Sequence, residues 1–268
     1  FKMADSQIDW SDLDAELLKP FKELQIEQTQ TQETLKKNDI KSLQKPFIKW
    51  VGGKTQIIEN ILTYFPTEME DYHELFLGGG SVLLAVLSLR KQKKIKIKNI
   101  YASDINKILI NLYKTIQTNP DELHTQLSKY FNTYANITGN TINRDPLNFD
   151  TAKTSKESYY YWMRKQFNNL SFGLDSNIDT NKIQIAAMFI FLNKTCFRGI
   201  YREGPYGFNV PYGHYKTTPS VITKAELQAI SNLIQDVKFR HIGFQDSIKD
   251  VHSGDFVYLD PPYAPENT

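Results

Sequence analysis

Residues 72–89 read YHELFLGGGSVLLAVLSL and combine three patterns that decide the fold. The apolar run at residues 72–77 predicts a strand, the glycines at 78–80 predict a tight turn, and the apolar segment after them predicts a buried helix. Further along the chain, residues 99–104 predict a second strand and residues 105–116 a second helix. This alternation predicts an α/β fold with a parallel sheet, in which loops at the carboxyl ends of the strands bind ligands.

The middle of the chain departs from this pattern. Residues 118–180 carry polar loops and one aromatic helix candidate at 157–170, and residues 181–195 predict a buried helix. A capping box that begins at Thr223 predicts another helix, and strand character returns within residues 237–260. The pattern therefore indicates that a second unit interrupts the sheet.

We expect three parts. Residues 45–117 and 237–268 form the α/β domain, and residues 118–236 form a domain inserted into it. Residues 1–44 are polar, rich in Gln and Thr and free of glycine, so we expect a loosely attached helical extension there.

Composition excludes several classes of protein. Apolar residues make up 40% and charged residues 23%, an ordinary globular balance, and no apolar stretch approaches the roughly 20 residues of a membrane span. The acidic first residues predict no signal peptide. The single cysteine, Cys196, excludes an intrachain disulfide and indicates a reducing compartment, the cytoplasm. We expect Cys196 to be a small packed residue rather than a nucleophile.

Positive charge is clustered although the net charge is only +2. Residues 193–216 contain Lys194, Arg198, Arg202 and Lys216 against Glu203 alone. Such a cluster is typical of a segment that binds phosphate-rich partners. A second lysine cluster, at residues 91–98, is better interpreted as a solvated helix end and loop.

Two glycine-containing stretches are candidate ligand turns. Gly53-Lys54-Thr55 resembles the end of a phosphate-binding loop, but that motif needs a glycine where Ile48 stands, so either a plain turn or a turn with Trp50 and Lys54 facing a ligand is expected. The glycine turn at 78–80 lets backbone approach a cofactor closely. Asp104 ends the next strand, where an acid reaches ribose hydroxyls in nucleotide-type sites, which favours a cofactor that contains a nucleoside.

Residues 255–263, DFVYLDPPY, place an acid, two prolines and an aromatic ring after an apolar strand. Proline fixes φ and lacks a donor, so the turn is stiff and its carbonyls are free to accept. The Asp260 carboxylate and the Pro261 carbonyl could accept hydrogen bonds from the two N–H groups of an adenine amine, and Tyr263 could stack on the adenine ring. The alternative is a solvated strand exit. S-adenosylmethionine is the cofactor consistent with these features, because its methyl group is already activated and no metal is required.

Together and in this order, FIKWVGGK, ELFLGGGS, YASDIN, NKTCFRGIYREGPYGFNVPYGHYK and DPPY resemble the Dam-type, α-group (D12 class) DNA adenine-N6 methyltransferases. The resemblance runs from about Lys45 to the end of the chain. It implies a Rossmann-like methyltransferase sheet with an inserted helical target-recognition domain, S-adenosylmethionine as cofactor and double-stranded DNA as partner. The cofactor contacts that it implies are Trp50, Lys54, Phe76, Gly78, Gly80, Asp104 and Asp260, and the catalytic residues are Asp260, Pro261, Pro262 and Tyr263.

The resemblance also assigns residues 193–216 to DNA. Phe197 would wedge beside the target base pair, Arg202 would read a guanine edge, and Ile200 and Pro211 would make apolar base contacts. The remaining expected DNA contacts, to phosphates or neighbouring bases, are Arg198, Tyr215 and Lys216. Arg198 stands where relatives often carry a small amide, and the segment after Arg202 is about one residue shorter than in some members.

The expected reaction is methyl transfer to N6 of a flipped adenine in a short duplex site, GATC or CATG, within a restriction-modification system. The alternatives are a methyltransferase acting on another planar amine or amide, such as an RNA base or glutamine, and a catalytically inactive DNA-binding module. Members of the family continue past the DPPY tetrapeptide (residues 260–263) with more strands and helices, so we expect a C-terminal part of the catalytic domain to follow Thr268.

Overall fold

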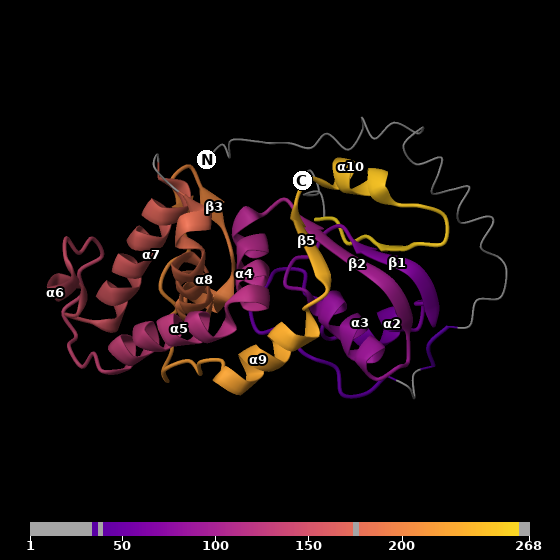
Figure 1. The fold of residues 1–268 in the computed structure, drawn as a ribbon. Helices are drawn as coiled ribbons and strands as arrows, with labels where there is room; N and C mark the ends of the chain where they lie inside the picture. Colours follow the sequence, from indigo (N-terminus) through magenta and orange to yellow (C-terminus); the bar gives the residue numbers. More distant parts are fainter. Residues whose placement is uncertain (1–33, 37–39, 174–176, 263–268) are drawn as a thin grey trace, which may run out of the picture.

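The computed structural model describes residues 34–36, 40–173 and 177–262 (Figure 1). Its centre is a parallel sheet of four strands in the order β5-β2-β1-β6, which confirms the predicted α/β class. The strands of this sheet are β1 (Glu68–Glu74), β2 (Lys96–Asp104), β5 (Val237–His241) and β6 (Phe256–Tyr258). A hairpin of β3 (Glu203–Gly204) and β4 (Gly207–Phe208) lies outside it.

The helices of the described residues include those predicted at 81–89, 105–116, 157–170, 181–195 and after Thr223, together with short and long helices that were not predicted. In chain order, the helices are α2 (Ile58–Leu62), α3 (Ser81–Lys91), α4 (Lys107–Thr118), α5 (Pro120–Ala135), α6 (Phe149–Ala152), α7 (Lys156–Phe172), α8 (Ile178–Thr195), α9 (Lys224–Leu233) and α10 (Phe244–Ser247), with 3₁₀ turns η3 (Phe197–Gly199) and η4 (Ile248–Asp250). The Thr223 capping box is confirmed, because its hydroxyl accepts the Glu226 N–H while the Glu226 carboxylate accepts the Thr223 N–H.

The first strand is longer and starts earlier than predicted. β1 begins at Glu68 and leaves the sheet after Glu74, so the apolar residues 75–77 lie beyond it. The polar beginning of β1 pairs in parallel with the polar beginning of β2, where Glu68 forms an ion pair with Lys96. Hydrophobicity alone misses these residues because cross-strand charge pairing, rather than burial, accompanies them.

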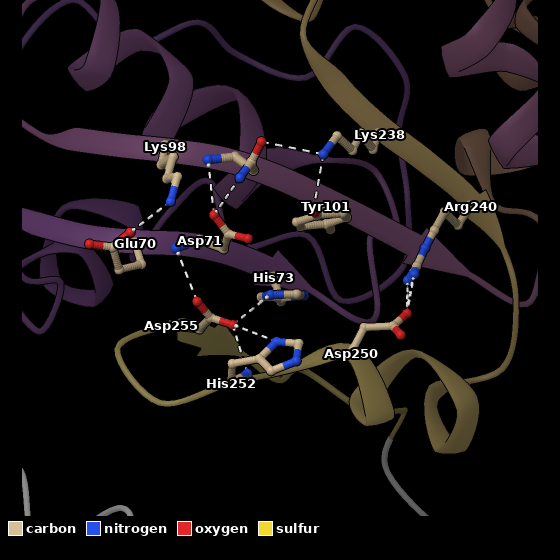
Figure 2. A network of polar contacts seen from close by, with 11 residues as sticks. Glu70, Asp71, His73, Lys98, Tyr101, Lys238, Arg240, Asp250, His252 and Asp255 are labelled. Carbon is tan, nitrogen blue, oxygen red and sulfur yellow. Dashed lines mark hydrogen bonds and ion pairs between the residues drawn. The ribbon is translucent and has the colours of Figure 1, made fainter.

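One face of the sheet is apolar and the other is polar. On the apolar face, Tyr113 of α4 stacks on Phe239 of β5 with ring centroids 5.2 Å apart. On the polar face, Figure 2 shows Asp255 contacting His73, and the His73 ring stacks on Tyr101 with centroids 4.8 Å apart. Arg240 of β5 forms an ion pair with Asp250 of η4. Polar contacts therefore attach the segment before β6 to this face.

The helices between α4 and α9 gather beside the sheet. In Figure 1, α5, α7 and α8 stand together on one side and α9 runs beneath. Residues 185–193 of α8 are all buried, as expected for a helix that is apolar around its circumference. Cys196 directly follows this helix and is fully buried, and burial raises the pKa of its thiol to about 12. It is the packed residue that the sequence predicts.

The expectation of a loosely attached helical extension is wrong for the part of it that the structure describes. Residues 34–36 and 40–44 are not helical, and Leu35 and Ile40 are buried in the core. The Leu35 N–H donates to the Phe65 carbonyl over 3.2 Å, and the Gln44 N–H donates to the Ser88 hydroxyl over 2.9 Å. Two isolated apolar side chains in a polar segment therefore hold it against the α/β domain. Residues 1–33 and 37–39 lie outside the described residues. Among the helices that are described, none is long and apolar enough to cross a membrane.

Candidate functional site

A cavity of ≈ 730 Å³ opens at the carboxyl ends of β1, β2 and β6. It brings together most of the predicted cofactor and catalytic residues, namely Trp50, Lys54, Phe76, Gly78, Asp104, Asp260, Pro261 and Pro262. Gly80 is not among its lining residues, and Tyr263 lies outside the described residues. This is the place where a parallel α/β sheet forms ligand sites, because the loops that leave the strands converge there.

The glycine turn forms one wall of the cavity and requires glycine at two positions. Gly78 and Gly80 adopt positive φ values of 50° and 66°. A Cβ on Gly80 would lie 2.2 Å from the Tyr113 hydroxyl, which donates to the Gly79 carbonyl over 2.9 Å. Trp50 packs against the other side of the turn, 3.1 Å from a Cβ on Gly78. Gly80 therefore shapes the turn from behind rather than lining the cavity.

Replacing Gly80 with alanine is expected to destabilise the protein by about 1–3 kcal/mol, because the backbone is left-handed and the new methyl group meets Tyr113. Chemical denaturation measures this loss. A second change, Tyr113→Phe, removes the nearest clashing atom and should partly restore stability in the double variant. Gly243→Ala serves as control, since a Cβ there meets nothing within 4 Å. Equal stability of the Gly80 and Gly243 variants would contradict the expectation.

Lys54 and Asp260 form an ion pair across the cavity. The Lys54 side chain is only 15% exposed, and its ammonium also donates to the Gly52 carbonyl over 2.9 Å. The Lys54 N–H donates to the hydroxyl of Ser81, the first residue of α3, over 3.1 Å. The turn at Gly53 therefore holds its lysine toward the cavity.

Asp104 ends β2 and supports the glycine turn. Its carboxylate accepts the Gly78 N–H over 2.9 Å and the Asn106 N–H over 2.8 Å. Burial raises the pKa of this carboxyl group, and the backbone N–H groups of Asn106, Gly78 and Ile105, together with His241, oppose that shift. Each oxygen accepts one of the bonds from Gly78 and Asn106, which leaves lone pairs on both for the hydroxyl groups of a ligand.

Glu74 is a cavity residue that sequence reasoning missed. It ends β1, is 1% exposed, and accepts a hydrogen bond from the Tyr72 hydroxyl over 2.7 Å. Burial, with Asp260 and Asp104 adding to it, raises the pKa of Glu74 to about 8. A signal was present, since a charged residue inside an apolar run before a glycine turn has no reason to be there for packing alone.

The raised pKa of Glu74 predicts a pH-dependent stability. The protonated carboxyl is favoured in the folded state, so its contribution is complete below the ordinary pKa of 4.5 and is lost as the pH rises toward about 8. Glu74→Gln is neutral at every pH. Its free energy of unfolding should therefore rise relative to the unchanged protein by up to about 3 kcal/mol between pH 5 and pH 8. Urea denaturation across this range measures it, and parallel pH profiles would refute it.

The expected DNA-binding residues all follow α8, and hydrogen bonds join two arms of that segment. The Phe197 N–H donates to the Pro211 carbonyl over 2.8 Å, and the Tyr215 hydroxyl donates to the Cys196 carbonyl over 2.9 Å. Phe197 is 44% exposed. Of the other predicted contacts, Arg198, Arg202, Pro211 and Lys216 are exposed, whereas Ile200 and Tyr215 are half-buried. Tyr215 is thus turned inward through its hydroxyl, while the basic side chains face outward.

Arg202 lies at the start of the β3–β4 hairpin. Its Nε donates to the Asn209 side-chain oxygen over 2.6 Å, across the hairpin. The neighbouring residue, Tyr201, stacks on Trp50 with ring centroids 5.2 Å apart. The cavity and the basic segment are therefore in direct contact, a link that no sequence pattern indicated.

A group with metal-ligand chemistry lies on the opposite face of β1 from Glu74. Asp71, His73 and Asp255 each place one ligand atom within 4.8 Å of the others (Figure 2). Hydrogen bonds among the described residues already use these atoms: Asn99 donates to Asp71 over 2.8 Å, and the His252 N–H donates to Asp255 over 2.8 Å. The group thus has a structural role on the polar face.

A parallel sheet with a glycine turn after one strand and a partly buried acid at the end of the next is consistent with a Rossmann-like methyltransferase fold. The family model for the D12 class N6 adenine-specific DNA methyltransferases matches residues 50–268. The chain belongs to this family, and members of the class use S-adenosylmethionine as methyl donor.

Similar curated proteins agree with this membership. The chain is 36% identical over 229 residues to Type II methyltransferase M.MjaIII of Methanocaldococcus jannaschii. The matched residues make up 83% of this chain and 70% of that protein. It is 31% identical over 235 residues to Type II methyltransferase M1.LlaDCHI of Lactococcus lactis subsp. cremoris, 86% of this chain and 69% of that protein. A DNA adenine methylase of Haemophilus influenzae is 30% identical over 223 residues, 82% of this chain and 64% of that protein. The predicted adenine-specific DNA methyltransferase activity is thus confirmed at the level of the family.

Proposed function

We propose that the cavity at the strand ends binds S-adenosylmethionine together with a flipped adenine, and that residues 193–216 select the DNA sequence. The observation that carries this proposal is the convergence of Lys54, the glycine turn 78–80, Asp104 and Asp260 on one cavity of ≈ 730 Å³. Sites for drug-sized ligands typically enclose about 300–1,000 Å³, so the volume suits a nucleoside cofactor and a base.

The residues present fit the cofactor. The positive φ of Gly78 and its contact with Trp50 leave no room for a side chain, so a ligand could approach the backbone of this turn closely. Asp104 keeps free lone pairs for ribose hydroxyls, and the carboxyl groups of Glu74 and Asp260 border the same cavity. When bound, S-adenosylmethionine would supply a methyl group already activated by its sulfonium charge.

Asp260 and Pro261 would bind the target amine. The adenine amine is a weak nucleophile because its lone pair is delocalised into the ring. Two acceptors, the Asp260 carboxylate and the Pro261 carbonyl, would accept hydrogen bonds from its two N–H groups and draw the nitrogen toward tetrahedral geometry. Among the described residues, none donates to the Pro261 carbonyl. Lys54, paired with Asp260, would hold that carboxylate in place. Tyr263 would stack on the base.

The base must leave the duplex to reach this cavity, which costs a few kcal/mol. Residues 118–236 would form the target-recognition domain, and residues 45–117 and 237–268 would belong to the catalytic domain. Phe197 would wedge beside the target pair, Ile200 and Pro211 would contact bases, and Arg198, Tyr215 and Lys216 would contact phosphates or neighbouring bases. We propose a palindromic site, GATC or CATG, a role in a restriction-modification system, and action in the cytoplasm on double-stranded DNA.

Sequencing of modified bases tests this function directly. The protein would be produced in a host that lacks adenine methylation, and single-molecule sequencing of its DNA would locate N6-methyladenine. One short adenine-containing palindrome should be methylated nearly everywhere it occurs. Absence of N6-methyladenine from DNA of cells that contain the folded protein, or its scatter without a common sequence, would overturn the proposal. The same host carrying the empty vector gives the background level of N6-methyladenine.

A further inference from the structure

Asn193 lies in the last turn of α8. Through three hydrogen bonds it joins Lys49, which is next to the cavity, to Gly199, which lies within the proposed recognition segment (residues 197–216). Its side-chain oxygen accepts the Lys49 N–H over 2.9 Å. Its side-chain nitrogen donates to the Lys49 carbonyl over 2.8 Å and to the Gly199 carbonyl over 3.0 Å. Asn193 is 2% exposed, so these bonds are shielded from water. One buried amide therefore holds both backbone segments.

The two segments that Asn193 joins are adjacent to the two proposed ligands. Lys49 directly precedes Trp50, which lines the cavity. Gly199 belongs to η3, between Phe197 and Ile200 of the proposed DNA contacts. The chain turns sharply here, because Arg198 and Gly199 both have positive φ values, 57° and 68°.

Close packing reinforces this connection. A Cβ on Gly199 would lie 2.5 Å from the Lys49 Cδ, so the Lys49 side chain packs directly against the backbone of Gly199. On the other side, the Trp50 ring stacks on Tyr201 with an interplanar angle of 21°. A shift of residues 49–50 would therefore be transmitted to residues 199–201.

We propose that Asn193 is a positioning residue that couples the cavity to the recognition segment, so that cofactor occupancy raises the affinity for DNA. The inference rests on the proposed function. A ligand that fixes Trp50 restricts Tyr201 and Gly199 as well, and the protein then binds DNA with a segment already in place. By linkage, DNA raises the affinity for the cofactor by the same factor.

Only an amide of this length satisfies all three partners. Asparagine offers one acceptor and two donors in a plane, and it matches one N–H and two carbonyls. Aspartate has the same shape but no donor, so its carboxylate would face the Lys49 and Gly199 carbonyls. Asn193→Asp and Asn193→Ala should both uncouple the two sites, the first by repulsion and the second by removing the bridge.

Binding measurements on the full-length protein test the coupling. The probes are S-adenosylhomocysteine and a fluorescent, unmethylated duplex that contains the recognition sequence identified by sequencing. All measurements use one fixed salt concentration because salt alters DNA affinity. Dissociation constants for the duplex are measured with and without saturating S-adenosylhomocysteine. For the unchanged protein we expect the constant to fall about tenfold, within the usual range of allosteric coupling. For Asn193→Ala we expect a change of less than about threefold.

Matched variants separate coupling from folding. Asn111 is also a buried asparagine, 8% exposed, and donates to the Lys182 carbonyl over 3.0 Å, so Asn111→Ala loses a comparable bond without joining the two segments and should keep the tenfold factor. Tyr201→Leu, which removes the stack on Trp50 at a half-buried position, should lose it, whereas Tyr201→Phe should retain it. If Asn193→Ala does not fold, the comparison of the two Tyr201 variants decides.

Several outcomes would overturn the inference. Equal duplex affinity with and without S-adenosylhomocysteine in the unchanged protein would do so, as would a tenfold factor that survives in folded Asn193→Ala and Tyr201→Leu. A failure of the proposed function looks different, because then S-adenosylhomocysteine would not bind to the unchanged protein or no adenine would be methylated.

Discussion

Replacing Asp260 with alanine is expected to reduce methyl transfer by about 10³-fold or more while the fold stays intact. The magnitude follows from the loss of a group that acts on the reacting atoms in a preorganised site. Asp260 faces Lys54 at the cavity, and its side chain is 24% exposed. The loss of one partly exposed ion pair costs little stability, so thermal unfolding should change only slightly. Single-turnover assays with labelled cofactor measure the rate.

Two further variants sharpen this test. Asp260→Asn keeps the shape but turns one acceptor into a donor that faces the amine, so it should be impaired to a similar degree. Asp250→Ala removes an exposed acid that pairs with Arg240, neither of which lines the cavity, and should keep full activity. Turnover of a folded Asp260→Ala protein within tenfold of the unchanged protein would contradict the proposed clamp.

Replacing Arg202 with alanine is expected to change which DNA sites are methylated. A guanidinium fork that reads a guanine contributes about 1–3 kcal/mol of discrimination, roughly 5- to 160-fold. The exposed Arg202 is held toward one side of the hairpin by Asn209, which would preorganise the fork. We expect weaker activity at the cognate site and relaxed preference at one base position. Sequencing of methylated adenines, together with kcat/KM on duplexes changed at each position, measures both.

Lys216 provides the contrast for this prediction. It is exposed and assigned to a phosphate, so Lys216→Ala should weaken binding to all duplexes alike and lower the slope of log affinity against log salt by about one. If Arg202→Ala and Lys216→Ala gave the same uniform loss with unchanged site preference, Arg202 would be a phosphate contact and the assignment would be wrong.

The sequence predicted those parts of the molecule in which local pattern and tertiary structure agree. The strand ending at Asp104, the glycine turn and the buried α8 were all predicted because apolar periodicity and glycine chemistry act locally. The beginning of β1 at Glu68 was not, since charge pairing with β2 replaces hydrophobicity there. Leu35 and Ile40 were missed because two apolar residues in a polar segment carry no periodicity.

The candidate site shows the same division. Residues within motifs, such as Lys54 and Asp260, were predicted and meet in one cavity. Phe244 stacks on Phe76 with centroids 5.5 Å apart, yet its surroundings in the sequence give no indication of a site. Asn193 likewise acquires its role only when α8 places it between Lys49 and Gly199, a juxtaposition of residues 144 positions apart in the case of Lys49.

The burial of Cys196 has a practical consequence for studying the recognition segment. Thiol-reactive dyes require the thiolate, which a buried group with a pKa of about 12 does not supply at neutral pH. The sequence contains no other cysteine. A cysteine introduced at an exposed position such as Tyr206 could therefore be labelled with a single fluorophore while Cys196 is left in place. Energy transfer from that fluorophore to labelled duplex could then report hairpin movement in real time.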